Sequence, residues 1–331
     1  MIVLTSDGVA ANALIRTNLA LDCWAWSEAL HIGPIGKTND LETFARQRAV
    51  VYGSLGWDEC QEVEVDFGLR NEALKRAVDG GQEIVLLFGK GIRDQLPLAR
   101  LLAWLADRAS FALGRVRLAL SNTDVQQTPG EVLDELVHGA RTVSMAQVRQ
   151  YESFWGAFAS SDPMDLENWR RGSEEGLLAE AAERLMQEFP SSDNGLSLTE
   201  CQILDILSLG VESPWEVFER FLETENAPYL NDWEFWLVLE RLMQGYTPLA
   251  TLGEGDSFLR PPKDLAWKPF QNQRIKLRLR GERVLAGEEH YGQLDFRERW
   301  IGGVRLHSES LWYWDYQQGC LTRDPLLRSA L

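Results

Sequence analysis

Short hydrophobic runs alternate with helical patterns over the first 143 residues. Runs of four to six mostly apolar residues predict strands at 1–5, 21–26, 83–88 and 116–120. Apolar residues spaced three and four apart predict helices at 10–19, 40–53, 69–78 and 92–105. Strands and helices in alternation are typical of a parallel sheet with helices on both faces. We therefore predict a mainly parallel three-layer α/β domain in residues 1–143.

The pattern then becomes almost entirely helical. Residues 144–189 show helical spacing, with an interruption at Ser160-Ser161-Asp162-Pro163. The stretch 190–195 consists of turn-forming residues, which favour a domain boundary. We predict a helical connector in residues 144–194.

Residues 195–331 show a third arrangement. Three helical patterns, 197–207, 213–224 and 231–245, come first. A strand at 273–279, a small helix at 281–287 and aromatic strands near 300–316 follow. This order predicts a winged-helix-like α+β domain, and it indicates a topology without indicating a function.

Length and composition agree with this organisation. A chain of 331 residues exceeds one ordinary core, and 45% hydrophobic with 25% charged residues is globular composition. Residues 1–7 lack the features of a secretory signal, and no apolar run is long enough to cross a bilayer. The four cysteines and four histidines show no spacing typical of a metal site or a disulfide framework. We expect a cytoplasmic protein without a metal, a cofactor or membrane contact.

The charge of the chain argues against nucleic acid as a partner. The formal net charge is −17 at pH 7, and phosphate is bound mainly by lysine and arginine. The third helix of the predicted winged-helix-like domain contains three acidic residues, at 232, 234 and 240, and one arginine, at 241. A winged-helix transcription factor would read DNA with this helix, so that function is the least favoured.

One basic segment is compatible with a nucleic-acid partner. Arg274, Lys276, Arg278 and Arg280 alternate with apolar residues, which predicts four cations on one face of a strand. Such a face could contact a nucleic-acid backbone, but it could equally pair with the acidic helices or with a protein partner. The overall charge favours pairing within the chain or with a protein.

Polar residues follow each predicted strand of the first domain. Ligands of open α/β sheets bind outside the carboxyl ends of the parallel strands. Asp7 or Glu28 could bind ribose hydroxyls or a metal, His31 could exchange a proton, and the turn at Gly8 could bring helix amides to an anion. The same residues could simply cap a helix or shape a turn. The candidate ligand-binding residues are Asp7, Gly8, Glu28, His31, Gly33, Arg46, Arg48, Lys90, Asp94 and Ser121.

Known catalytic motifs are missing from the sequence. Gly89-Lys90-Gly91 lacks the longer loop and the Ser or Thr of a phosphate-binding loop, and no nucleophile elbow is present. We therefore expect a ligand-sensing or protein-interaction module without catalysis, with a small anionic or nucleotide-like ligand and a protein partner. The alternative is an enzyme acting on a nucleotide or another phosphorylated small molecule, with Asp7, Glu28 and His31 binding a metal or acting as acid and base, and with Arg46 or Arg48 holding the anion.

Several motifs resemble a bacterial family of two uncharacterised domains. His31-Ile-Gly-Pro34 and the segment 85–96 resemble domain of unknown function 1835. The segments 189–200, 231–233, 299–306 and 312–315 resemble the associated domain of unknown function 3658. The family more usually has Gly-Asp where this chain has Ser6-Asp7, and an arginine where it has Tyr313. The resemblance implies a bacterial protein with this domain order and implies no activity.

Overall fold

A computed structural model gives the fold of the chain. It describes residues 1–18, 22–56, 60–108, 113–252, 257–261, 267–294 and 296–323. Contacts divide the chain into two compact units. Unit 1 comprises residues 1–183 and 300–304, and unit 2 comprises residues 184–299 and 305–331.

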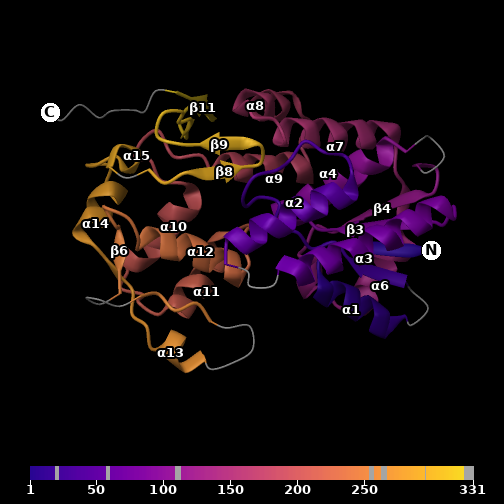
Figure 1. Ribbon diagram of the computed structural model, residues 1–331, viewed down its shortest axis with the longest axis horizontal. Coiled ribbons are helices and arrows are strands. Elements are labelled where there is room, and N and C mark those ends of the chain that lie inside the picture. Colours follow the sequence, from indigo (N-terminus) through magenta and orange to yellow (C-terminus); the bar gives the residue numbers. More distant parts are fainter. Residues whose placement is uncertain are drawn as a thin grey trace. The chain divides into compact units, whose positions relative to one another are not determined.

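Unit 1 contains a five-stranded sheet surrounded by helices (Figure 1). Its strands are β1 (Ile2–Thr5), β2 (Asp22–Ala25), β3 (Ile84–Phe88), β4 (Val116–Leu120) and β5 (Arg141–Thr142). Its helices are α1 (Gly8–Thr17), α2 (Leu41–Ser54), α3 (Cys60–Asp79), α4 (Ile92–Ala106), η1 (Val125–Gln127), α6 (Gly130–His138), α7 (Met145–Phe158) and α8 (Pro163–Gly172). Helix α9 (Leu177–Met186) contains the boundary between the units.

The sheet confirms the predicted parallel arrangement. The strand order is β2-β1-β3-β4-β5, and β1 pairs in parallel with both β2 and β3. Strand β4 continues the parallel sheet beside β3. The antiparallel edge strand β5 and the helices η1 and α6 before it were not predicted, because this part of the sequence has only short apolar runs.

Helices cover both faces of this sheet. Val3, Val85 and Leu87 pack on one face against Leu14 of α1 and Leu133 of α6. The alternate residues of β3 point to the opposite face and are also buried, where α4 packs on β3 and α7 packs on α4 (Figure 1). Burial of both faces explains why β3 consists of hydrophobic residues only.

The helices of residues 144–183 belong to unit 1. Helix α7 packs along α4, and Ser144 and Gln147 form a capping box that fixes the start of α7. The predicted domain boundaries after residues 143 and 194 stay predictions. The contacts within the chain divide it into its two units after Glu183. Residues 190–195 pair with strand β10 of unit 2: Trp314 donates its N–H to the Pro190 carbonyl at 2.8 Å.

Unit 2 begins with the three expected helices and continues with short elements. The helices are α10 (Leu198–Ser208), α11 (Pro214–Thr224), α12 (Asp232–Leu242), α13 (Trp267–Gln271), α14 (Leu279–Leu285) and α15 (Tyr291–Leu294). The strands are β6 (Ala250–Thr251), β7 (Lys276–Leu277), β10 (Tyr313–Asp315) and β11 (Cys320–Thr322). Strands β8 (Arg299–Ile301) and β9 (Val304–Leu306) each contain a boundary between the two units. Among the described helices of both units, none combines the length and apolar character that a membrane crossing requires.

The predicted strand at 273–279 is wrong in its extent. Strand β7 covers only two residues, and the chain turns at Arg278 to begin α14 at Leu279. Gly281 allows this turn, because a Cβ there would lie 2.5 Å from the Leu249 carbonyl oxygen. The four cations at 274, 276, 278 and 280 therefore do not share one strand face.

A buried ion-pair cluster and an aromatic cluster hold unit 2 together. Glu200 is the third residue of α10 and accepts a hydrogen bond from Arg299 at 2.8 Å, and Arg241 lies 3.7 Å from the same oxygen. Phe218 and Trp236 pack with their rings tilted, at 5.5 Å between centroids, in a buried group of rings from α11 and α12. Trp236 and Trp314 are both buried and contribute to the core.

The turn between β8 and β9 is part of unit 1 and depends on glycine. Gly302 has φ +57°, and its carbonyl accepts from Ile35 N–H at 3.1 Å. A Cβ at this position would collide with the Phe158 carbonyl oxygen and lie 2.7 Å from Phe158 Cε2. Gly319 has nearly the same φ, +60°, but has open space around it.

We predict that Gly302→Ala lowers the free energy of unfolding by about 3 kcal/mol, and Gly319→Ala by about 1 kcal/mol. In both variants an alanine must adopt a positive φ, which is unfavourable. Only in Gly302→Ala does the new Cβ also collide with Phe158. Chemical denaturation and melting temperatures of the two variants measure the difference. Equal losses would show that the turn does not pack tightly on α7.

Candidate functional site

Three loops of unit 1 meet at the carboxyl edge of the parallel sheet. Asp94, in the first turn of α4, accepts hydrogen bonds from Ser6 Oγ, just after β1, and from Gly89 N–H, just after β3, the latter at 2.7 Å. Because β1 leads to β2 on one side and pairs with β3 on the other, the topological switch point of the sheet lies here. Asp94 therefore joins the two loops at the place where open α/β sheets bind ligands.

Side chains from two helices hold the loop after β3. Gln95 donates from its Nε2 to the Gly89 carbonyl at 2.5 Å, and Tyr151 of α7 donates to Gln95 Oε1 at 2.9 Å. A Cβ on Gly89 would lie 3.0 Å from the Thr123 carbonyl oxygen, in the loop after β4. The loops after β3 and β4 therefore lie in close contact, and both main-chain polar groups of Gly89 are fixed.

Two further carboxylates lie at this edge. Asp7 caps α1 by accepting from Val9 N–H at 2.6 Å, and its second oxygen accepts from Gln126 Nε2 at 3.4 Å. Asp124 caps η1 by accepting from Gln126 N–H at 3.0 Å. The other oxygen of Asp124 is buried and has no hydrogen-bond partner among the described residues. We call Ser6, Asp7, Asp94 and Asp124 the edge cluster.

The electrostatics of the edge cluster favour protonation. Burial, with a contribution from the charge of Asp124, raises the pKa of Asp94 to about 6, although hydrogen bonds from Ser6 and Gly89 oppose the rise. Burial and the charge of Asp7 raise the pKa of Asp124 as well. Near pH 6 the cluster can therefore both accept and donate hydrogen bonds.

The loop after β2 contains a second group of candidate residues, and the buried side chain of one arginine fixes the shape of this loop. Arg48 is buried and donates to the carbonyls of Ala29, Ile32 and Pro34 at 2.8, 2.9 and 3.1 Å. Gly33 has φ +72°, and a Cβ there would collide with Val51 Cγ1. These contacts fix the shape of the His31-Ile-Gly-Pro34 motif.

Glu28 is part of a buried ion pair. It pairs with Arg70, and the guanidinium of Arg70 stacks on Phe67 and Trp26 at 3.9 and 4.4 Å from their ring centroids. His31, 5% exposed, lies in the same loop. Glu28 and Arg48 thus have structural partners, which argues against the enzyme arrangement that uses Glu28 as a catalytic acid and Arg48 as an anion clamp.

The structure separates the candidate residues into distinct places. Asp7 and Asp94 share the edge cluster, and Ser121 bonds Thr123 in the adjoining loop, Oγ to Oγ1 at 2.9 Å. Gly8 is the first residue of α1, and Lys90 is half-buried beside Gly89. Arg46 is exposed on α2 and bonds Thr43. Glu28, His31, Gly33 and Arg48 form the separate loop after β2.

Sequence reasoning missed three residues of this region, Asp124, Gln95 and Tyr151. Asp124 follows β4 by four residues, so the rule that pointed to Asp7 could also have pointed to it. Gln95 and Tyr151 gave no such signal, because their contact joins residues 56 positions apart.

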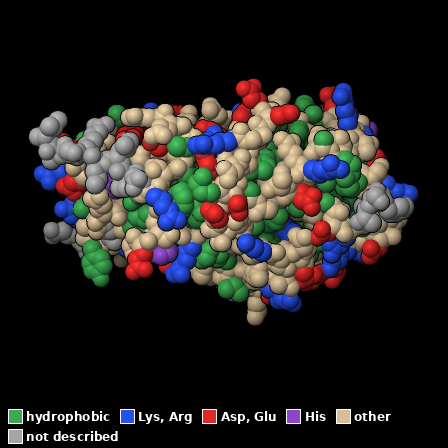
Figure 2. Space-filling model, turned by 90° about the horizontal axis from the view of Figure 1, so that it is seen from above, with side chains coloured by type: hydrophobic (Ala, Val, Ile, Leu, Met, Phe, Trp, Pro, Cys, Tyr) green, Lys and Arg blue, Asp and Glu red, His purple; other side chains and the backbone are tan. Residues whose placement is uncertain are grey.

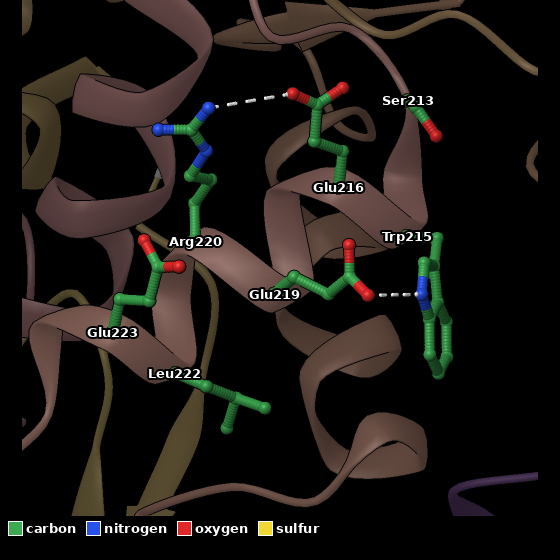
Figure 3. Close-up of a pocket in the computed structure, with 7 residues that line it drawn as sticks. All are labelled: Ser213, Trp215, Glu216, Glu219, Arg220, Leu222 and Glu223. Carbon is green, nitrogen blue, oxygen red and sulfur yellow. Dashed lines mark hydrogen bonds and ion pairs between the residues drawn. The ribbon is translucent and has the colours of Figure 1, made fainter.

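A shallow cavity of about 600 Å³ lies along α11 in unit 2 (Figure 3). Trp215 donates to Glu219 at 2.9 Å, and Arg220 lies 3.8 Å from Glu216. The lining residues are Ser213, Trp215, Glu216, Glu219, Arg220, Leu222 and Glu223. Three acids against one arginine make this face of α11 acidic, as expected for this domain.

Comparisons with known proteins do not place the chain. No family model matches it, and no curated protein matches it either. The resemblance to the two uncharacterised domains therefore stays a prediction. Within the described residues, no group of three or more His, Cys, Asp or Glu side chains is arranged to hold a metal ion.

We predict that Asp94→Asn increases the stability of the folded protein, relative to wild type, by a larger amount as the pH rises. The folded-state pKa, about 6, lies above the ordinary aspartate pKa of 3.8, so wild-type stability falls as pH rises between these values and then levels off. The amide cannot ionise, and its oxygen can still accept from Ser6 and Gly89. The difference in unfolding free energy, variant minus wild type, should increase by about 2 kcal/mol between pH 4 and pH 7.

Urea unfolding at pH 4, 5, 6 and 7 measures this difference. Asp79→Asn, at the exposed end of α3, is the matched control and should show no comparable trend. A flat difference for Asp94→Asn would show that this carboxyl is not desolvated in the folded protein.

Proposed function

We propose that the protein is a ligand-sensing and protein-interaction module without catalysis, and that unit 1 binds a small, hydroxyl-bearing, nucleotide-like ligand at the edge cluster. The observation that carries the proposal is the junction at Asp94, which joins the loops at the switch point of the sheet. Carboxylates accept hydrogen bonds from sugar hydroxyls and repel anions. The hydroxyl-bearing part of the ligand therefore faces Asp7 and Asp124.

An anionic part of such a ligand would lie near the cations of the neighbouring loop. Lys90 and Arg93 are half-buried at the start of α4, and the charge of Arg93 acts on both Asp94 and Asp124. One site can therefore accommodate hydroxyls and a negative group at different positions. This arrangement supports a nucleotide-like ligand over a simple anion.

A thermal-shift panel of nucleosides, nucleotides and sugars with the full-length protein tests this function. We predict that at least one hydroxyl-bearing ligand raises the melting temperature by about 2 °C or more at millimolar concentration. Asp7→Asn and Asp124→Asn should weaken its binding about tenfold or more, because an uncharged amide is a weaker acceptor.

Both substitutions preserve the local fold, since asparagine caps helices as well as aspartate does. Asp79→Asn makes the same charge change on the exposed end of α3 and should leave affinity unchanged. If no member of the panel stabilises the protein, or if the edge variants bind as tightly as wild type, the proposed site is wrong.

One observation favours a second candidate, an enzyme acting on a nucleotide or another phosphorylated small molecule. A carboxyl group with a pKa of about 6 can exchange protons near neutral pH, and Asp94 is hydrogen-bonded to the Ser6 hydroxyl. Turnover of a panel ligand, followed by NMR and abolished in Asp94→Asn, would favour this candidate over sensing. An unchanged ligand spectrum would remove it.

For unit 2 we propose a winged-helix-like topology that contacts a protein. Three helices followed by short β-hairpins support the topology, and the acidic face of α11 supports a basic partner. Figure 2 shows acidic and basic side chains interspersed on one face of the molecule, without a continuous basic tract among the described residues drawn there. This distribution and the net charge of −17 give nucleic acid little support.

The partner proposal has a direct test. Binding of a lysine-rich peptide at low salt should weaken in the double variant Glu216→Gln/Glu223→Gln, and not in Glu174→Gln/Glu175→Gln, where exposed acids lie outside α11. Equal weakening in both double variants would indicate attraction by net charge alone.

The cytoplasm is the proposed location, supported by the free thiols of Cys23, Cys201 and Cys320.

A further inference from the structure

A second cavity in unit 2 is lined by arginine. It has a volume of about 480 Å³ and lies between the segment before β6 and the start of α14. Tyr246, Thr247 and Pro248 form one wall, and Arg278, Arg280 and Arg283 contribute to the other. We call it the arginine cavity.

Close main-chain packing places these two walls together. Arg278 N–H donates to the Leu249 carbonyl at 2.9 Å, and a Cβ on Gly281 would lie 2.5 Å from the same oxygen. Only glycine lets α14 approach the chain this closely. As a result, residues just before Leu249 and three arginines around Gly281 line the same space.

The arginine cavity has an excess of positive charge. Arg280 and Arg283 share one carboxylate, Glu289, at 3.0 and 3.3 Å. Arg278 donates to Thr251 Oγ1 at 3.3 Å and forms no ion pair within the described part of the chain. Three guanidinium groups against one carboxylate leave two positive charges on a protein whose net charge is −17.

The cavity also presents an aromatic ring. The Tyr246 side chain is 97% exposed, which is unusual for so large a ring. Arginine forks match the geometry of phosphate oxygens, and an exposed tyrosine offers a face on which a planar ring can stack. A phosphate monoester carries about two negative charges at neutral pH, equal to the excess in the cavity.

We propose that the arginine cavity binds the phosphate monoester of a small aromatic metabolite, of the chemical class of nucleoside monophosphates. The arginines bind the phosphate, and Tyr246 stacks on the aromatic ring. A phosphate polymer fits less well, because the chain as a whole carries a net charge of −17 and would repel further phosphates. This proposal is independent of the edge cluster, which lies in unit 1.

Calorimetric titration of AMP into the full-length protein at low salt tests the proposal. We expect AMP to bind more tightly than inorganic phosphate, and adenosine more weakly than AMP. Arg278→Gln and Arg283→Gln should each weaken AMP binding about tenfold or more, and Arg278→Lys should have a smaller effect because it keeps the charge and loses the fork.

Two controls separate this site from others. Lys276→Gln removes a charge from neighbouring β7 outside the cavity and should leave AMP affinity unchanged. Asp124→Asn alters the edge cluster, so AMP binding that this variant keeps and that the two arginine variants lose belongs to the arginine cavity, and failure of either site is recognised by itself. The arginine side chains are exposed, so the variants should keep the wild-type circular dichroism and melting temperature.

Three results would overturn the proposal. The first is AMP affinity that Arg278→Gln and Arg283→Gln leave unchanged. The second is no binding of AMP to the wild-type protein at 10 mM, a concentration about tenfold above a millimolar dissociation constant. The third is tighter binding of a single-stranded oligonucleotide than of AMP with the same dependence on the two arginines, which would identify a polymer site.

Discussion

The parallel pairing of β1 with β3 is the constraint on which the rest of unit 1 depends. Ile2 pairs with Ile84 and Thr5 with Leu87, so the pairing joins residues far apart in sequence. Parallel neighbours require crossover connections, which α1, β2, α2 and α3 supply. With the register fixed, the strand ends lie together, and Ser6 meets Asp94. The contact between Ser6 and Asp94 in the edge cluster therefore follows from this one pairing.

Buried arginines are the second recurring device of unit 1. The long segment between β2 and α2 has no regular structure, so its carbonyl groups need partners from outside. Arg48 satisfies three of them, and Arg100 of α4 donates to the Thr38 carbonyl at 3.1 Å while stacking on Phe44. The planar guanidinium suits this task, because it offers several donors and an apolar face at once.

The sequence predicts the elements of the fold better than it predicts their contacts. The all-hydrophobic run of β3 and the capping residue Asp40 marked their elements clearly, because burial on both faces and helix capping leave strong local signals. The cations from 274 to 280 misled the strand assignment, since alternation alone does not reveal that Gly281 must pack on Leu249. Asp7 and Asp94 were found by the rule of strand ends, whereas Arg70 as the partner of Glu28 depends on tertiary structure alone.

Charge balance distinguishes the two groups of polar residues at the edge of the sheet. Glu28 is buried, but Arg70 neutralises it and two rings cover the guanidinium, so the pair is complete without a ligand. Within the described residues, neither Asp94 nor Asp124 forms an ion pair, and burial raises the pKa of both. A buried acid without a counter-ion costs folding free energy, and proteins concentrate such costs at functional sites.

The same reasoning applies to the arginine cavity, where the uncompensated charge is positive because Glu289 balances only part of it. Incomplete compensation of charge, and not the mere presence of charged residues, is therefore the observation on which we propose both places as binding sites.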